Sequence, residues 1–189
     1  MKNLLKTISR SVPREPLVLI TALALAAGAW GFIEISDNVL AGNTQAFDEW
    51  AVRVLRQPND LSQPVGPTWL AEAGRDITAL GGVTVLLLVI AGVAGFLWVS
   101  RGHRMLAVLL IATLSGILLS LSLKQGFSRP RPDLVPHLSR VYTSSFPSGH
   151  SMMSAVVYLT LASIVSTTLK RTAMKVYVFV VAFAVILAI

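Results

Sequence analysis

Residues 78–100, TALGGVTVLLLVIAGVAGFLWVS, and residues 105–123, MLAVLLIATLSGILLSLSL, hold no ionisable side chain. Each run is long enough to cross the hydrocarbon core of a bilayer as an α-helix, which takes about 20 residues. A short connection joins them, and it carries the basic residues Arg101, His103 and Arg104. The pair therefore predicts a helical hairpin that spans a membrane.

Three further apolar runs lie on either side of this hairpin, at residues 16–33, 151–169 and 176–189. The whole sequence is 54% hydrophobic and only 13% charged, and its mean hydropathy is +0.70. These values lie outside those of ordinary soluble domains. We therefore expect an all-α polytopic transmembrane helical bundle, with residues 1–189 forming a single membrane domain. The absence of cysteine excludes disulfides and Cys-based metal sites.

The first run follows a basic N-terminus and is long enough to remain as an uncleaved anchor. A cleaved signal peptide is the alternative, because the stretch from Ala22 to Ala29 offers small residues of the kind that a signal peptidase accepts.

Residues 34–77 are polar and predict the first outer loop. Inside this loop apolar residues recur at helical spacing, with acidic residues early and basic residues late, as the helix dipole favours. The apolar positions are Phe47, Trp50, Ala51, Val54 and Leu55. We expect an amphipathic helix that lies flat on the membrane surface. A helix packed against the bundle is an equally open interpretation.

Basic residues in short loops indicate the orientation, because they concentrate on the cytoplasmic side. The N-terminus, the 101–104 connection and the 170–175 connection carry Lys2, Lys6, Arg10, Arg14, Arg101, Arg104, Lys170, Arg171 and Lys175. This bias places the N-terminus in the cytoplasm and residues 34–77 and 124–150 outside it. It also accounts for most of the net charge of +7 without a nucleic-acid partner. The cytoplasmic membrane of a bacterium is the expected location.

The last run, residues 176–189, gives roughly 21 Å of helix at about 1.5 Å per residue, against a hydrocarbon core of about 30 Å. It is too short to finish crossing. We therefore expect these residues to be the N-terminal part of a longer chain, with five spans present out of six.

The second outer loop, residues 124–150, is basic on the side where basic residues are normally sparse. Lysine supplies a compact charge and arginine a planar fork that matches phosphate oxygens. Lys124 together with Arg131 or Arg129 therefore predicts a phosphate clamp. Arg140 is a further candidate contact.

Pro147, Ser148, Gly149 and His150 stand directly before the run at 151–169. Ser148 is a natural N-cap, and Gly149 lets backbone N–H groups approach an anion closely. His150 would lie near a bound phosphate and could protonate a leaving oxygen at neutral pH. The sequence therefore predicts a phosphate site at the start of this helix.

Lys124, six intervening residues, Arg131-Pro132, and then Pro147-Ser148-Gly149-His150 resemble the first two signature motifs of the PAP2 family, the type 2 phosphatidic acid phosphatases related to vanadium haloperoxidases. The resemblance implies a six-helix bundle and a phosphatase that needs no metal or cofactor. It implies that Lys124, Arg131, Ser148 and Gly149 bind phosphate and that His150 protonates the leaving group.

The family's nucleophile is a histidine in a third motif, which this sequence lacks. Ser139-Arg140 begins like that motif, but Phe146 stands where the histidine belongs and His150 where the aspartate belongs. His103 is expected on the cytoplasmic side, and His137 has no acidic partner at a recognisable spacing. We therefore expect residues 1–189 alone to hydrolyse no phosphate ester.

The expected substrates are lipid phosphates or diphosphates, hydrolysed in the family through a phosphohistidine. Phosphatidic acid, phosphatidylglycerol phosphate, undecaprenyl diphosphate and other prenyl diphosphates all remain open, as does the oligomeric state. A non-catalytic membrane protein that binds anionic headgroups or a partner is the alternative. A transporter is disfavoured, because the four complete spans carry no ionisable residue in their interiors.

Overall fold

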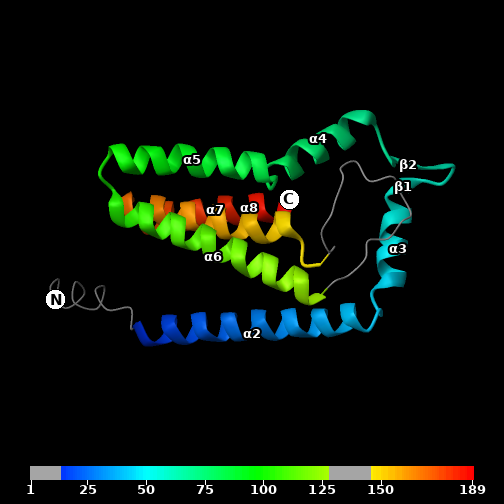
Figure 1. The fold of residues 1–189 in the computed structure, drawn as a ribbon, viewed down its shortest axis with the longest axis horizontal. Coiled ribbons are helices and arrows are strands. Elements are labelled where there is room, and N and C mark those ends of the chain that lie inside the picture. The colour runs from blue at the N-terminus through cyan, green and yellow to red at the C-terminus, as the bar shows by residue number, and fades with distance from the viewer. Residues whose placement is uncertain (1–13, 128–145) are drawn as a thin grey trace, which may run out of the picture. The chain divides into compact units, whose positions relative to one another are not determined.

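The computed structural model describes residues 14–127 and 146–189. The chain divides into two compact units, residues 1–50 and residues 51–189, with the boundary inside α3. The elements are α2 (Arg14–Leu40), α3 (Gln45–Val54), β1 (Arg56–Gln57), β2 (Asp60–Pro64), α4 (Thr68–Ala79), α5 (Val83–Val99), α6 (His103–Phe127), α7 (Gly149–Thr168) and α8 (Thr172–Ala188). The predicted all-α class therefore holds apart from a small hairpin (Figure 1).

In the first unit, α2 continues to Leu40, beyond the end at residue 33 that the sequence predicted. Polar side chains in this extension bond to carbonyls one turn back. Ser36 Oγ donates to Phe32 O at 2.6 Å and Asn38 Nδ2 donates to Glu34 O at 2.9 Å. The helix ends at Leu40, and Gly42 just after it has a φ of 74°, the left-handed conformation that closes many helices. Part of the predicted loop at 34–77 is therefore helix.

The amphipathic helix expected around residues 47–55 is present as α3. Its Phe47 and Trp50 rings lie 5.6 Å apart between centroids, and these side chains are 65% and 58% exposed. Its place flat on a membrane stays a prediction.

A two-stranded antiparallel hairpin, β1 and β2, follows α3 and was not predicted. Asp60, the first residue of β2, accepts two hydrogen bonds from Ser62 of the same strand. Ser62 donates to Asp60 Oδ1 through its hydroxyl at 2.6 Å and through its backbone N–H at 2.9 Å. These two hydrogen bonds, the hydroxyl first, hold the pKa of the Asp60 carboxyl below its usual value.

The predicted span at 78–100 is broken. α4 and α5 meet at a bend of 47°, and α5 begins only at Val83. We define residues 80–82 as the α4–α5 junction. Across it, the N–H groups of Leu80, Gly81 and Gly82 each bond to the carbonyl three residues back, at 2.9–3.1 Å. This tighter turn ends the regular hydrogen-bond pattern of α4 and changes the direction of the chain.

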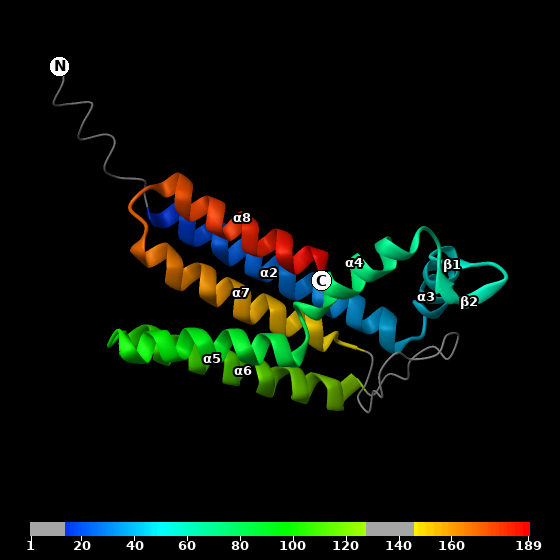
Figure 2. The ribbon, with the colours of Figure 1, turned by 90° about the horizontal axis from the view of Figure 1, so that it is seen from above.

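Helix α7 lies at the centre of the second unit and packs against α5, α6 and α8. Figure 2 shows it between α8 and the α5–α6 pair. Leu109 of α6 and Val157 of α7 are fully buried in the apolar core that these helices share. A Cβ on Gly116 of α6 would lie 2.9 Å from Val156 Cγ2. Because glycine leaves that space free, α6 and α7 approach closely, as small residues allow in membrane bundles.

Three helices are long and apolar enough to cross a membrane, α2, α6 and α7, and the bent α4–α5 pair makes a fourth if it counts as one span. α8, from Thr172 to Ala188, is shorter. The predicted number of five spans is therefore not confirmed among the described residues. Phe96 and Trp98 of α5 are 70% and 67% exposed, as expected for side chains that face lipid rather than water.

Candidate active site

The two predicted phosphate-binding segments meet where α6 ends and α7 begins. Lys124 lies in the last turn of α6, and Gly149 is the first residue of α7. A Cβ on Gly149 would lie 3.1 Å from Lys124 Nζ and 3.5 Å from Lys124 Cε. The ammonium group is thus in contact with the start of α7. A cation and a helix N-terminus, both of which attract anions, occupy one place.

Ser148 is the N-cap of α7, as the sequence predicted. Its Oγ accepts the Ser151 N–H at 3.3 Å and the Ser151 hydroxyl at 3.2 Å. The Met152 N–H bonds to the Ser148 carbonyl at 3.1 Å, which closes the first helical turn. The N–H groups of Gly149 and His150 belong to the first turn, where a helix supplies no carbonyl partner. They are donors that an anion would satisfy.

An aromatic contact joins the ends of the stretch that separates α6 from α7. The Phe127 and Phe146 rings meet edge to face, with centroids 5.0 Å apart and planes at 89°. The Phe146–Pro147 peptide bond is cis, and Pro147 is buried. Phe127 and Phe146, the described residues on either side of this stretch, therefore lie side by side.

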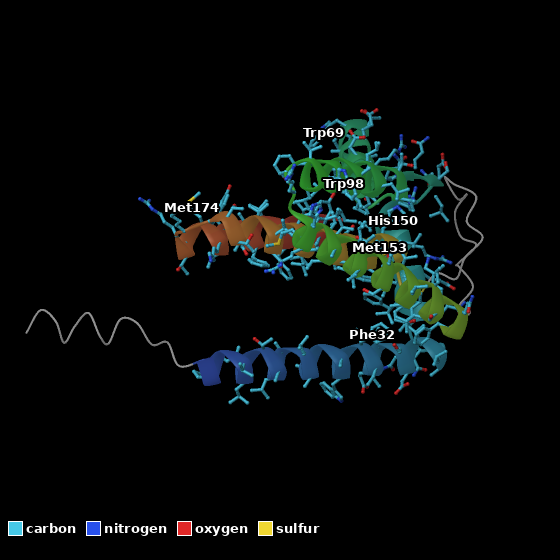
Figure 3. The ribbon with its side chains drawn as sticks, turned by 60° about the vertical axis from the view of Figure 1, so that its left-hand side comes forward. Phe32, Trp69, Trp98, His150, Met153 and Met174 are labelled. Carbon is cyan, nitrogen blue, oxygen red and sulfur yellow. The ribbon has the colours of Figure 1, made fainter. Side chains whose placement is uncertain are left out.

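His150 is the second residue of α7, and its side chain is exposed. Figure 3 shows it on α7, with Met153 one turn further along the helix. His150 therefore belongs to the same first turn as these N–H groups. A group in this place can exchange a proton with a ligand held by those donors.

Four of the predicted site residues are described, and three of them, Lys124, Ser148 and Gly149, come together at one point. His150 follows directly. The remaining candidates lie outside the described residues: Arg129, Arg131, Arg140 and the weaker candidate His137. His103 begins α6 at the other end of that helix, where its ring meets Trp98 edge to face at 5.8 Å.

Within residues 14–127 and 146–189, no group of three or more His, Asp or Glu side chains is placed to hold a metal ion. The cationic and N–H donor character of the α6–α7 meeting point suits an anion instead.

Sequence reasoning missed one neighbour of this site, Gly81 in the α4–α5 junction. A Cβ there would lie 3.3 Å from His150 Cβ. Two adjacent glycines inside an apolar run are the signal that could have found it, because such a pair often marks a close backbone approach.

Residues 104–189 match the model of the PAP2 superfamily, a range that contains α6, α7, α8 and both motifs. The chain is 33% identical over 150 residues to phosphatidylglycerophosphatase B of Bacillus subtilis (strain 168). That match covers 78% of this chain and 64% of the relative, so the chain spans less than two thirds of the relative's length.

The fold is also similar to the crystal structure of a transmembrane PAP2-type phosphatidylglycerolphosphate phosphatase from Bacillus subtilis. The TM-score is 0.66 at 28% sequence identity, over 84% of this chain and 77% of that one. Together with the apolar helices, this similarity identifies an integral membrane protein.

Proposed function

We infer that the chain belongs to the PAP2 superfamily, and we propose that its α6–α7 meeting point is the phosphate cradle of a lipid phosphate phosphatase. One observation carries the proposal: Lys124 Nζ is in contact with Gly149 at the start of α7. The Lys124 ammonium and the N–H groups at the start of α7 both attract anions, so one phosphate can contact both.

In this proposal the Lys124 ammonium and the first N–H groups of α7 bind two different oxygens of the phosphate. Ser148 Oγ serves as acceptor in both of its contacts, so its own hydrogen can donate to a third oxygen. The family motif adds Arg131 to this set, with Arg129 and Arg140 as further candidates. Each hydrogen bond to the charged phosphate is stronger than a neutral one.

His150 acts as the general acid in this proposal. A histidine nucleophile attacks phosphorus, the bond to the lipid oxygen breaks, and His150 gives its proton to that oxygen as it leaves. Water then hydrolyses the phosphohistidine and releases phosphate. Within residues 1–189 no histidine stands in a third motif. Loss of a nucleophile costs a factor of about a million, so we expect these residues alone to bind the ester without hydrolysing it.

The proposed orientation places the cradle on the extracytoplasmic side of a bacterial cytoplasmic membrane. The α5–α6 connection, which contains Arg101, and the α7–α8 connection, which contains Lys170 and Arg171, lie at one end of the helix bundle of the second unit. The start of α7 lies at the other end (Figures 1 and 2). Basic turns favour the cytoplasm. The site end then faces outward.

Phosphatidylglycerol phosphate is the substrate that we would test first, because the relative and the solved structure are both named for it. Phosphatidic acid and prenyl diphosphates such as undecaprenyl diphosphate present the same chemistry, a phosphate on a lipid tail.

The test is a binding titration of the purified chain in detergent micelles with short-chain phosphatidylglycerol phosphate, with phosphatidylglycerol as the matched lipid that lacks the terminal phosphate. We expect tighter binding of the phosphate monoester and no release of inorganic phosphate. Equal affinity for the two lipids contradicts the cradle. Steady phosphate release that His150→Ala abolishes contradicts the proposed need for a further nucleophile.

A further inference from the structure

The α4–α5 junction rests directly on the face of α7 that begins with His150. Tyr158 of α7 donates its hydroxyl hydrogen to Leu80 O at 2.9 Å, a contact between residues 78 positions apart. His150, Ser154 and Tyr158 follow one another at intervals of four and therefore share one face of α7. The junction therefore contacts this face at His150 and Ser154 through Gly81, and at Tyr158 through Leu80.

Gly81 makes the closest approach. The position that its Cβ would take lies 2.8 Å from Ser154 Oγ, 3.3 Å from His150 Cβ and 2.6 Å from Ile189 Cγ2. Neither Gly81 nor Gly82 has a positive φ, so the backbone conformation does not demand glycine here. Glycine is needed here for packing instead. Because Gly81 has no side chain, the backbone of the junction can lie against His150 and Ser154.

Two atoms of α7, Ser154 Oγ and His150 Cβ, limit the space at Gly81. Ser154 is completely buried, and its Oγ has no hydrogen-bond partner among the described residues. His150 Cβ is fixed to the helix backbone. The end of the Ile189 side chain and Ser154 Oγ can each rotate about their own Cα–Cβ bonds, but His150 Cβ can yield only if α7 itself shifts.

From this packing we propose that Gly81 is a positioning residue for His150. The junction backbone forms a wall against His150 Cβ, which reduces the rotamers open to the imidazole and directs it toward the α7 N-terminus. The hydrogen bond from Tyr158 to Leu80 holds this wall in place. The inference rests on the proposed function for the role of His150 at a phosphate, but the packing contact itself does not.

The test follows the imidazole signal of His150 by NMR in the purified chain, in detergent micelles, with and without short-chain phosphatidic acid. The chain contains three histidines, so single His→Gln substitutions assign the signals. Gly81→Ala should move the His150 signal in the ligand-free chain and reduce the change that phosphatidic acid produces in it. Gly92→Ala is the matched control, because a Cβ at Gly92 meets no atom within 4 Å.

A second comparison tests whether the contact with Ser154 causes the change of the His150 signal in Gly81→Ala. Ser154→Ala removes the hydroxyl that a Cβ on residue 81 would meet, so Gly81→Ala combined with Ser154→Ala should bring the His150 signal back toward that of Ser154→Ala alone. If Gly81→Ala fails to fold, Tyr158→Phe replaces it, since that change removes only the bond to Leu80. Tyr158→Phe should move the His150 signal in the same direction as Gly81→Ala, but by a smaller amount.

The inference is overturned if the ligand-free His150 signal is the same in the wild type, in Gly81→Ala and in Tyr158→Phe. A different outcome tests the proposed function: if phosphatidic acid leaves the wild-type His150 signal unchanged, His150 does not lie at a phosphate site. In that case the ligand-free comparison still decides whether Gly81 positions the imidazole.

Discussion

Helices α6 and α7 make two close contacts through glycine, and the two contacts differ in what faces the glycine. In the interior, Gly116 of α6 faces Val156 of α7, with 2.9 Å between the position of a Cβ and Val156 Cγ2. At the outer end, Gly149 of α7 faces the Lys124 ammonium of α6 at 3.1 Å. The first contact is apolar on both sides, and the second brings a charge to a helix end.

Within this helix pair, the contact at Gly116 therefore serves packing, and we assign the contact at Gly149 to ligand binding. Val156 fills the space at Gly116 with a stiff branched side chain, so any added volume there must move backbone. Lys124 reaches Gly149 with the far end of a flexible side chain, which can move at little cost. We therefore expect changes at the interior contact to alter stability and changes at the outer contact to alter ligand affinity.

The largest effect is expected from Lys124→Ala. In the proposed site it removes a charged hydrogen bond to the phosphate, worth about 1.5–3 kcal/mol, which corresponds to roughly 10- to 150-fold weaker binding of phosphatidylglycerol phosphate. The thermal midpoint should stay close to that of the wild type. Lys170→Ala is the matched control, because Lys170 lies at the other end of α7. Equal losses in both variants would mean that only the net charge matters.

A somewhat smaller effect, on stability, is expected from Gly116→Val. The added side chain meets Val156, and overpacking of this kind costs about 1–3 kcal/mol. Thermal unfolding in micelles measures the loss. Gly95→Ala serves as control, because a Cβ there meets nothing within 4 Å. Adding Val156→Ala should restore part of the loss, and an unchanged midpoint in Gly116→Val would contradict the close packing of α6 on α7.

Ser148→Ala should lower the free energy of unfolding by about 1 kcal/mol, the usual cost of losing an N-cap. It should also weaken lipid phosphate binding, because the cap both closes the first turn and supplies a donor. Ser163→Ala provides the comparison, since the Ser163 hydroxyl only bonds back to Leu159 O at 2.8 Å. A Ser148→Ala chain with unchanged affinity would restrict Ser148 to capping.

The smallest effect concerns the hairpin, which lies outside both glycine contacts. The folded pKa of Asp60 is lowered by Ser62. Its contribution to stability is therefore complete above the unfolded pKa of about 3.9 and is lost as the pH falls through the lower folded value. We expect the Ser62 amide resonance to move below about pH 4 in the wild type. The same movement in Asp60→Asn would assign it to another group.

Much of this arrangement was predictable from the sequence, because the charge-free runs and the Ser148 cap are local signals. The helices α6 and α7 appeared near their expected positions, and His150 took the predicted place in the first turn. The break at residues 80–82 was not predicted, although the Gly81-Gly82 pair is a turn signal, because the charge-free run around it is long enough to be read as one span. The contact between Tyr158 and Leu80 joins distant segments, and no local pattern indicates it.

The central claim is that the phosphate of a lipid binds at the start of α7, and the backbone amide resonance of Gly149 tests it most directly. In a titration of the ¹⁵N-labelled chain with short-chain phosphatidylglycerol phosphate, the Gly149 N–H should shift downfield as it donates to a phosphate oxygen. Phosphatidylglycerol should produce no such shift, and Lys124→Ala should greatly weaken it. A Gly149 resonance that responds equally to both lipids, or to neither, would contradict the account.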